Sequence, residues 1–463
     1  MNSLRIVKGR RGAVGFIILL IALLGGLVMA RRQVQAQAGR PNVIFIVVDA
    51  LRPDHLSGYG YERPTSPNLD AFMASGARFA EATSTSSWTY PSNAAMLTGL
   101  MPSHIGVKDW ASPPGVVPAE RTLLAELLHD AGYQNVGFVT NYFLWPKFGL
   151  NQGFDHYDRL NGSERAEDLN QMAFDWLTEH PDAGESQPLF LYMYYYDSHS
   201  WYDPPAPYDT LYDSTYTGSL TPELYGHGRS VIAGELVLEP RDVEYLLALY
   251  DGEITYWDIH FQQLMDRLAA EGLLENALVV VTSDHGEMFG EHGKWLHGNS
   301  LYEEVLRVPL LIRYPGVVAA GRVSDTPVMT TDLMPTVLDL LNLPVPDGLD
   351  SLSLKPLLTE EPGAIAERPI YAEMNGEVNP TSISYGVAPR YHLRSIKEGN
   401  RKYILAFGVP EENVLYQVEP NSLYEGENII ADYPAQAEDF HYRLYSWFQL
   451  PTQFRLIPVM FQE

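Results

Sequence analysis

The stretch Trp-Thr-Tyr-Pro-Ser-Asn-Ala-Ala-Met-Leu-Thr-Gly, residues 88–99, begins with turn-forming residues and continues as a run of helix formers. Pro91 suits a first helical turn, and Gly99 suits the position just past a helix end. The stretch therefore predicts a turn that opens a short helix. Thr89 places a hydroxyl at its start, where backbone N–H groups and the helix dipole favour an anion. A capped helix without a further role is the alternative interpretation.

Polar clusters follow three apolar runs that lack a helical period and are typical of buried parallel strands, residues 42–48, 188–196 and 277–283. The clusters are Asp49 with Arg52, Asp54 and His55; Asp197, Ser198 and His199; and Ser283, Asp284, His285, Gly286 and Glu287, followed by His292, Lys294 and His297. Any one of them alone is typical of a surface turn. Because parallel strands end at one edge of a sheet, we expect the three clusters to converge. Carboxylates with one imidazole suit a divalent metal ion.

The rest of the first two thirds of the chain alternates between strand and helix patterns. Further predicted strands are residues 136–139 and 308–313, and predicted helices are residues 66–76, 122–130, 242–271 and 332–341. This alternation predicts an α/β fold in which one large, parallel-rich sheet is sandwiched by helices.

Two regions depart from the alternation. Residues 200–240 are rich in Tyr, Pro and Gly and are expected to lie over the carboxyl edge of the sheet. Their aromatic side chains would either stack on a sugar or lipid head group or pack on one another. Those side chains are Trp201, Tyr202, Tyr208, Tyr212 and Tyr225. Residues 343–369 are predicted to be a linker that wraps the first domain.

The C-terminal part has a different pattern. Short strands at residues 391–397 and 402–407, followed by a helix near residues 435–448, predict a smaller α+β subdomain. The expected divisions are residues 1–39, an N-terminal stub and apolar segment; 40–375, the main domain; and 376–463, the subdomain.

Composition limits the classes of function. With 463 residues and 46% hydrophobic residues, the chain can bury a large core. Its formal net charge of −27 argues against nucleic acid as a partner. The chain has no cysteine, so disulfides, thiolate metal sites and cysteine nucleophiles are excluded.

The N-terminal segment has the pattern of an export or anchor signal. Residues 13–30 are uncharged and mostly apolar, with basic residues on both sides. Their length is at the lower limit for a membrane span, and we expect an uncleaved anchor. Cleavage after Ala38, which would give a secreted protein, is the alternative. The basic excess before the run predicts a cytoplasmic N-terminus and an extracytoplasmic main domain.

Over about residues 40–450, the sequence resembles the sulfatase family of the alkaline phosphatase superfamily. The matching motifs are residues 42–49, 67–70, 97–99, 282–287, 290–293, 301–304, 307–309, 332–333 and 335–336. The resemblance implies an alkaline-phosphatase-like fold and ester hydrolysis at a metal site.

The nucleophile motif departs from the family pattern at two positions. Pro91 and the pair at residues 98–99 keep the family spacing. Thr89 stands where the family has the cysteine or serine that becomes formylglycine, and Asn93 stands where it has an arginine. Threonine cannot be converted to formylglycine by that route. The motif Thr-x-Pro at residues 89–91 instead resembles that of phosphodiesterases and of phosphoethanolamine or phosphoglycerol transferases of the superfamily. In those enzymes the threonine oxygen attacks phosphorus.

The resemblance also implies a metal site in which Asp49, Asp284 and His285 are ligands and Thr89 completes the set. Ala50 replaces an acidic ligand that is usual in the family. One divalent ion is expected. Members of the family usually bind Ca²⁺. Compared with the usual ligand set, this one has fewer carboxylates and an added imidazole nitrogen, which favours Mn²⁺, Zn²⁺ or Mg²⁺.

Three further catalytic side chains follow from position within the resemblance. His199 matches a histidine that contacts the ester oxyanion, and His297 matches a lysine that protonates the leaving group. The family usually has a lysine and a histidine just after the strand near residue 140, and here Thr140 and Asn141 stand in their place. Asn141 would donate a hydrogen bond to the bound ester anion. As an alternative to a single ion, Asp197 with His199 and His297 would hold a second metal in a two-metal arrangement.

The sequence therefore predicts a metal-dependent hydrolase of sulfate or phosphate esters with Thr89 as nucleophile. One alternative is a phosphoethanolamine- or phosphoglycerol-type transferase that acts on a membrane or glycan acceptor. Another is an inactive sulfatase-like binding protein. The expected partners are the ester substrate, with a glycan or a lipid head group as the candidate carriers, and the membrane through residues 13–30. Nucleic acid is not an expected partner.

Overall fold

The computed structural model describes residues 39–107, 115–160, 164–221, 229–232, 234–359, 364–375, 392–407 and 409–450. The expected anchor at residues 13–30 and the aromatic Tyr225 lie outside these ranges. Among the described helices, none has the length and apolar character needed to cross a bilayer.

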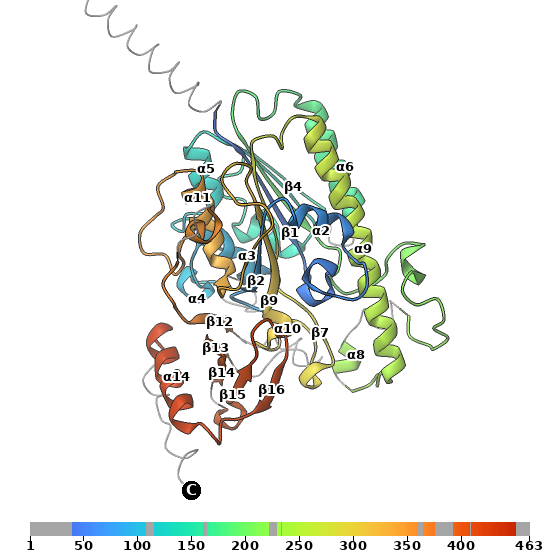
Figure 1. The fold of residues 1–463 in the computed structure, drawn as a ribbon, viewed down its shortest axis with the longest axis vertical. Helices are drawn as coiled ribbons and strands as arrows, with labels where there is room; N and C mark the ends of the chain where they lie inside the picture. The colour runs from blue at the N-terminus through green and yellow to red at the C-terminus, as the bar shows by residue number, and fades with distance from the viewer. Residues whose placement is uncertain are drawn as a thin grey trace, which may run out of the picture.

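A nine-stranded sheet forms the centre of the larger domain (Figure 1). Its order is β10-β2-β9-β6-β1-β5-β3-β4, and β11 pairs with β2. The strands are β1 (Asn42–Val48), β2 (Ala77–Thr83), β3 (Gln134–Val139), β4 (His156–Arg159), β5 (Leu189–Tyr195), β6 (Ala277–Ser283), β9 (Arg307–Arg313), β10 (Arg322–Ser324) and β11 (Val328–Met329). Neighbours among β6, β1, β5, β3 and β4 are parallel, so these strands end at one edge. The predicted α/β fold is confirmed.

One central strand runs against the others. The sequence pattern placed residues 308–313 in a parallel sheet, but β9 is antiparallel to both β6 and β2. The chain between β6 and β9 contains only short elements: β7 (Met288–Phe289), β8 (Trp295–Leu296) and the single turn α10 (Glu303–Leu306). Because no crossover helix returns the chain to the opposite edge, β9 starts where β6 ends and runs back.

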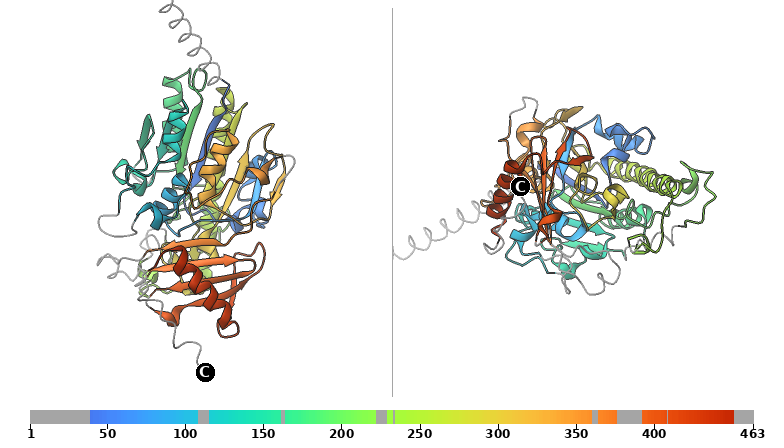
Figure 2. Two further views of the ribbon diagram at one scale, coloured as in Figure 1. Left: turned by 90° about the vertical axis from the view of Figure 1, so that its left-hand side faces the viewer. Right: turned by 90° about the horizontal axis from the view of Figure 1, so that it is seen from below.

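Helices cover both faces of the sheet, as Figure 2 shows edge-on. Alternate residues of β1 enter two separate cores: Val43 and Phe45 face one, and Ile44 and Ile46 face the other. The first core includes α3 (Thr89–Thr98), α5 (Leu124–Asp130), α11 (Leu333–Leu340) and α12 (Lys355–Leu358); the second includes α2 (Pro67–Met73), α6 (Ala166–Glu179) and α9 (Pro240–Ala270). Burial on both faces explains why β1 is a continuous apolar run.

A five-stranded antiparallel sheet with one covering helix forms the C-terminal subdomain (Figure 1). Its elements are β12 (Ile370–Met374), β13 (Leu393–Glu398), β14 (Arg401–Ala406), β15 (Val414–Val418), β16 (Glu425–Asn428) and α14 (Pro434–Trp447). β12 pairs with β13, so the sheet takes in residues that precede the expected division at residue 375.

The insertion after β5 packs mainly on the larger domain. Tyr202 is fully buried, with its ring 5.5 Å from both Tyr250 and Phe289. Tyr212 donates a hydrogen bond to the carbonyl of Pro64. Trp201, in contrast, is 53% exposed. These aromatic residues therefore divide between internal packing and the surface. The insertion also contains the short helix α8 (Arg229–Ile232).

Candidate active site

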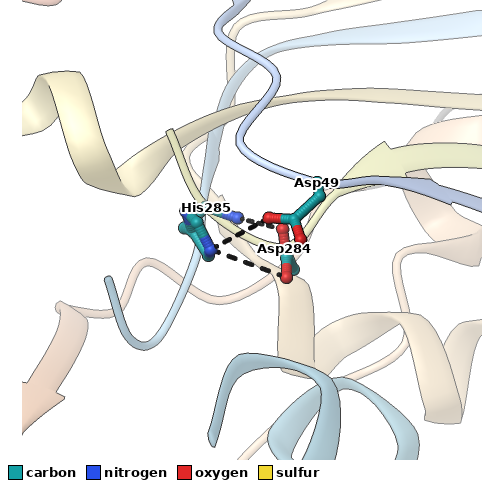
Figure 3. Close-up of side chains that lie close together, drawn as sticks. All are labelled: Asp49, Asp284 and His285. Atoms are coloured by element: carbon teal, nitrogen blue, oxygen red, sulfur yellow. Dashed lines mark hydrogen bonds and ion pairs between the residues drawn. The ribbon is translucent and has the colours of Figure 1, made fainter. Parts of the chain in front are cut away.

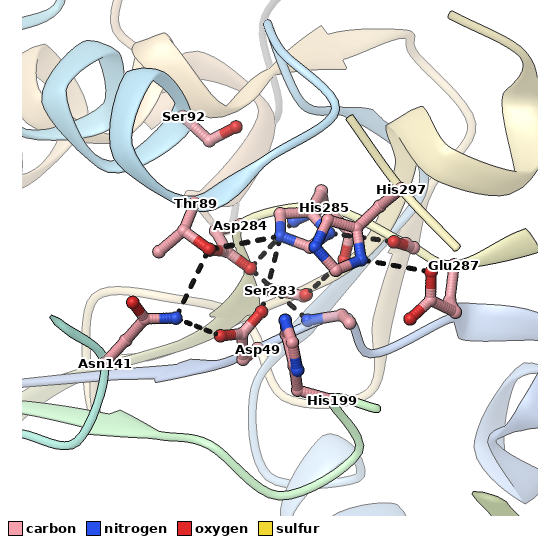
Figure 4. Close-up of polar contacts among 12 residues, drawn as sticks. Asp49, Thr89, Ser92, Asn141, His199, Ser283, Asp284, His285, Glu287 and His297 are labelled. Atoms are coloured by element: carbon pink, nitrogen blue, oxygen red, sulfur yellow. Dashed lines mark hydrogen bonds and ion pairs between the residues drawn. The ribbon is translucent and has the colours of Figure 1, made fainter. Parts of the chain in front are cut away.

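Helix α3 positions Thr89 beside the carboxyl edge of the sheet (Figure 4). Thr89 is the first residue of the helix, and Gly99 ends it in a left-handed conformation with φ 69°. All ten residues of the helix are buried, which fixes its first turn against the sheet. The sequence prediction for residues 88–99 as a turn followed by a helix is thus confirmed.

Asp49, Asp284 and His285 meet at the ends of β1 and β6 (Figure 3). The register pairs Val48 with Ser283, so the carboxylates that follow these residues lie side by side. His285 Nε2 is 3.3 Å from Asp49 Oδ1 and 3.7 Å from Asp284 Oδ2. All three side chains are fully buried, and one ligand atom of each lies within 4.8 Å of the others.

The hydrogen-bond pattern of this cluster fits a cation. His285 Nδ1 is 2.8 Å from the carbonyl oxygen of Gly286, which can only accept, so neutral His285 presents the lone pair of Nε2 to Asp49. Among the described residues, none donates a hydrogen bond to the buried Asp49 Oδ1. Two carboxylates and one imidazole nitrogen with convergent lone pairs are a donor set for a divalent ion.

Burial raises the pKa of Asp49 to about 7, and the negative charge of Asp284 adds to the rise. Asn141 Nδ2 donates to Asp49 Oδ2 over 2.8 Å and opposes the rise. On Asp284 Oδ2, the Tyr194 hydroxyl donates over 2.6 Å and Asn93 Nδ2 over 3.1 Å. These donors are neutral, so they orient the carboxylates without balancing their charge.

Thr89 lies beside the same cluster. Its Oγ1 is 3.5 Å from His285 Nε2 and 3.4 Å from Asn141 Nδ2. Asn93 Nδ2 also donates to the Thr89 carbonyl over 2.8 Å, one helical turn away. Asn93 and Asn141 therefore hold Thr89 and the carboxylates in one hydrogen-bonded network. Ala50, in the place of the missing acid, has a left-handed φ of 57°.

His297 and His199 face His285 from the other side of the cluster (Figure 4). The His297 ring centre is 4.4 Å from that of His285 and 4.8 Å from that of His199. His199 comes from the loop after β5 and its pKa is lowered by burial. The structure thus brings the two predicted histidines together at the metal cluster.

Sequence analysis missed the role of Glu287. Its carboxylate is fully buried and lies 3.0 Å from His297 Nδ1, and it also accepts a hydrogen bond from the Tyr202 hydroxyl. Burial alone would raise the pKa of Glu287, but the charge of His297 outweighs it and lowers the pKa. In the sequence, the signal for this role was the position of Glu287, a second carboxylate two residues after His285.

The alternative second metal site, with Asp197, His199 and His297 as ligands, does not form. Asp197 is turned away from His199 and His297, and its Oδ1 accepts the backbone N–H of Ala166 at the start of α6. Among the described residues, two clusters of acidic and histidine side chains are close enough to share an ion, and Asp197 belongs to neither of them. The side chain lines an adjoining cavity of about 300 Å³ that shares His199 with the site.

Comparisons with known proteins agree with this architecture. Residues 41–343 match the sulfatase family model, and residues 290–397 match the model of the N-sulphoglucosamine sulphohydrolase C-terminal region. An ulvan-active sulfatase of Formosa agariphila is 28% identical over 369 residues, which cover 72% of this chain and 68% of the relative. An arylsulfatase of Clostridium perfringens is 26% identical over 388 residues, covering 69% and 79%.

Solved structures share the fold. A phosphonate monoester hydrolase from Silicibacter pomeroyi superposes with a TM-score of 0.68 at 22% identity, covering 90% of this chain and 96% of that one. A structure in complex with its substrate D-glucosamine-2-N,6-O-disulfate has a TM-score of 0.69 at 21% identity, covering 89% and 98%. Because the sulfatase model spans well over half of the chain, the protein belongs to the sulfatase family and is an ester hydrolase.

Proposed function

We propose that the protein is a metal-dependent hydrolase of sulfate or phosphate esters in which Thr89 is the nucleophile. The position of Thr89 carries this proposal. Its hydroxyl oxygen lies 3.5 Å from His285 Nε2, beside the cluster of Asp49, Asp284 and His285. A hydroxyl at the first turn of a helix, beside convergent metal ligands, is placed to become an attacking oxygen.

Asp49, Asp284 and His285 would hold one divalent ion. Such an ion lowers the pKa of a nearby hydroxyl and polarises the oxygens of the bound ester. With only two carboxylates and one nitrogen, the ligands favour Mn²⁺, Zn²⁺ or Mg²⁺ over Ca²⁺. The neutral donors Asn93 and Tyr194 leave the full carboxylate charge available to the ion.

The chain's own residues then perform the exchange. Thr89 Oγ1 loses its proton to water and forms a bond to sulfur or phosphorus as the ester bond to the alcohol breaks. The departing alcohol oxygen takes a proton from His297 in its charged form, which Glu287 holds and stabilises at 3.0 Å. Water then attacks sulfur or phosphorus and gives a proton to His297, while the bond to Thr89 Oγ1 breaks and this oxygen takes a proton from solvent. His199 would contact the bound ester, and Asn141 would keep Thr89 Oγ1 oriented.

Transfer to an acceptor other than water remains a prediction, as does the extracytoplasmic, membrane-anchored location. Both depend on residues 13–30, which lie outside the described ranges. An anchored protein would favour an acceptor on the membrane or on a glycan.

Replacement of the nucleophile tests the proposal. We expect Thr89→Ala to lower kcat/KM for aryl sulfate or phosphate diesters by about a thousandfold or more, because the attacking oxygen is lost. Thr89→Ser keeps the oxygen and serves as the matched control, with a loss of about tenfold or less. Acid quenching during turnover should trap a sulfo or phospho group on the peptide that contains residue 89. Full activity of Thr89→Ala would show that the nucleophile is assigned wrongly.

A further inference from the structure

The cavity beside the candidate active site has an unusual balance of charge. It measures about 300 Å³ and is lined in part by His199, whose ring centre also lies 4.8 Å from that of His297. The cavity is lined by Glu164, Arg165, Tyr196, Asp197, His199, Trp201, Asp203 and Glu253. Four of these residues are acids, and one is a cation.

Arg165, the arginine of the cavity, already forms hydrogen bonds with Asp203. Arg165 NH2 is 2.7 Å from the carbonyl oxygen of Asp203 and 3.4 Å from its carboxylate. Glu253, which is 6% exposed, accepts only a neutral donor in this region, the backbone N–H of Asp203 at 2.9 Å. The hydrogen bonds of Arg165 are therefore made to Asp203, and among the described residues no cation forms an ion pair with Asp197 or Glu253.

Asp197 shows most directly what the cavity would bind. This residue is only 6% exposed, and its Oδ1 accepts the backbone N–H of Ala166. Its other oxygen, Oδ2, has no hydrogen-bond donor among the described residues. A buried carboxylate oxygen without a donor is unfavourable, so the site calls for a ligand that brings N–H groups, a positive charge, or both. Burial correspondingly raises the pKa of Asp197 to about 7.

Aromatic rings border the same space. Trp201 is 53% exposed at the cavity, and the Tyr196 ring lies 4.5 Å from that of His199. The face of an aromatic ring attracts a cation within about 6 Å. Carboxylates and aromatic faces together suit an ammonium group.

We propose that this cavity binds a positively charged amino group on the alcohol part of the substrate ester. The assignment rests on the proposed function, because Thr89 marks the point where the ester is cleaved and His199 connects that point to the cavity. An ester cleaved at Thr89 would extend its alcohol part past His199, with the ammonium group between Asp197 and Trp201. The substrate class is therefore a sulfate or phosphate ester of an amino alcohol.

A matched pair of esters tests the proposal. The probes are 2-aminoethyl sulfate and propyl sulfate, together with the corresponding aryl phosphate diesters; within each pair the shape is nearly equal and only one member carries the charge. In the wild-type enzyme we expect kcat/KM for the aminoethyl ester to exceed that for the propyl ester by about tenfold or more. Equal values, or a preference for the propyl ester, would overturn the proposal.

Substitutions in the cavity test whether its residues cause the preference for the aminoethyl ester over the propyl ester. Asp197→Asn keeps an acceptor for the Ala166 N–H and removes the charge, and it should bring the ratio of the two kcat/KM values close to one. Trp201→Ala, at an exposed position, should lower the ratio about threefold. Asp175→Asn, on the exposed face of α6, is the charge-matched control and should leave the ratio unchanged. An unchanged ratio in both cavity variants would also overturn the proposal.

Binding separates this proposal from the proposed function. Calorimetry on Thr89→Ala should give a Kd for 2-aminoethyl sulfate about tenfold below that for propyl sulfate, whether or not the wild-type enzyme turns either ester over. Absence of turnover with this difference in Kd would refute only the mechanism. Turnover of both esters with equal Kd values would refute only the ammonium site.

Discussion

Two clusters of this protein each combine one histidine with two carboxylates, but they have different surroundings. In the first, His285 faces Asp49 and Asp284 at 3.3 and 3.7 Å. In the second, His292 faces Glu304 at 3.4 Å and Glu425 at 3.6 Å. By donor type and spacing alone, either could hold a metal ion.

The neighbouring charges differ. In the second cluster, Lys402 Nζ lies 2.7 Å from Glu425 Oε1 and 2.8 Å from Glu303, and Lys397 Nζ is 3.1 Å from Glu303. In the first cluster, the donors to the carboxylates are amides and a tyrosine hydroxyl. In the second cluster a lysine therefore pairs with Glu425, and the raised pKa of His292 keeps a positive charge beside Glu304. Among the described residues, the first cluster has only imidazoles as positive partners.

This difference indicates different roles. Glu425 belongs to β16 in the C-terminal sheet, while His292 and Glu304 belong to the larger domain, so the second cluster joins the two parts of the protein. The first lies at the sheet edge beside Thr89 and needs a positive charge from outside. Buried carboxylates that the fold does not neutralise are the ones that recruit an ion.

Neutralising one acid in each cluster gives the largest expected contrast. Asp284→Asn should lower kcat/KM by about a thousandfold or more, because it removes a metal ligand beside the nucleophile. Glu304→Gln should keep kcat/KM within about threefold of the wild-type value and lower the free energy of unfolding by about 1 kcal/mol. Steady-state kinetics and denaturant unfolding measure both. A loss of activity in Glu304→Gln as large as in Asp284→Asn would contradict the division of roles.

Metal content sharpens the comparison. Purified protein should contain about one divalent ion per chain. At a metal-ion concentration a thousandfold above its Kd, binding should raise the free energy of unfolding by about 4 kcal/mol. His285→Ala should lose both the ion and this stabilisation, whereas His292→Gln should keep them. Elemental analysis and thermal unfolding with and without a chelator provide the measurement. Two ions per chain, with one lost in His292→Gln, would show that the second cluster is also a metal site.

A pH dependence of stability is the smallest expected effect. Burial would lower the pKa of His292, but Glu304 and Glu425 outweigh burial and raise it from 6.5 to about 9. A histidine whose pKa is higher in the folded state stabilises the fold fully below pH 6.5 and loses this contribution as pH rises through 9. Because the side chain is partly solvated, we expect a loss of about 2 kcal/mol in the free energy of unfolding.

Denaturant unfolding of metal-free protein from pH 6 to 10 measures this loss. His292→Gln is the control and should reduce the dependence across that range. If His292→Gln left the whole dependence in place, the raised pKa of His292 would not be its source.

Much of the fold and the metal cluster could be predicted from the sequence because they depend on local pattern. Apolar runs marked β1, β5 and β6, and polar clusters followed each of them. The resemblance to the sulfatase family then singled out Asp49, Asp284 and His285 as the expected ligands. The direction of β9 could not be predicted, because a strand pattern is the same in either orientation and the connection decides it.

The residues that the sequence misassigned or missed depend on long-range packing. Asp197 follows its strand as Asp49 does, yet its side chain turns toward the N-terminus of α6 and lines the cavity. Glu287 gains its role only because the fold places His297 at 3.0 Å from it. The sequence by itself determined which residue types stand at the sheet edge. Only the tertiary structure decided which of their charges are balanced inside the protein, because that balance depends on groups far apart along the chain, such as Glu425 and His292.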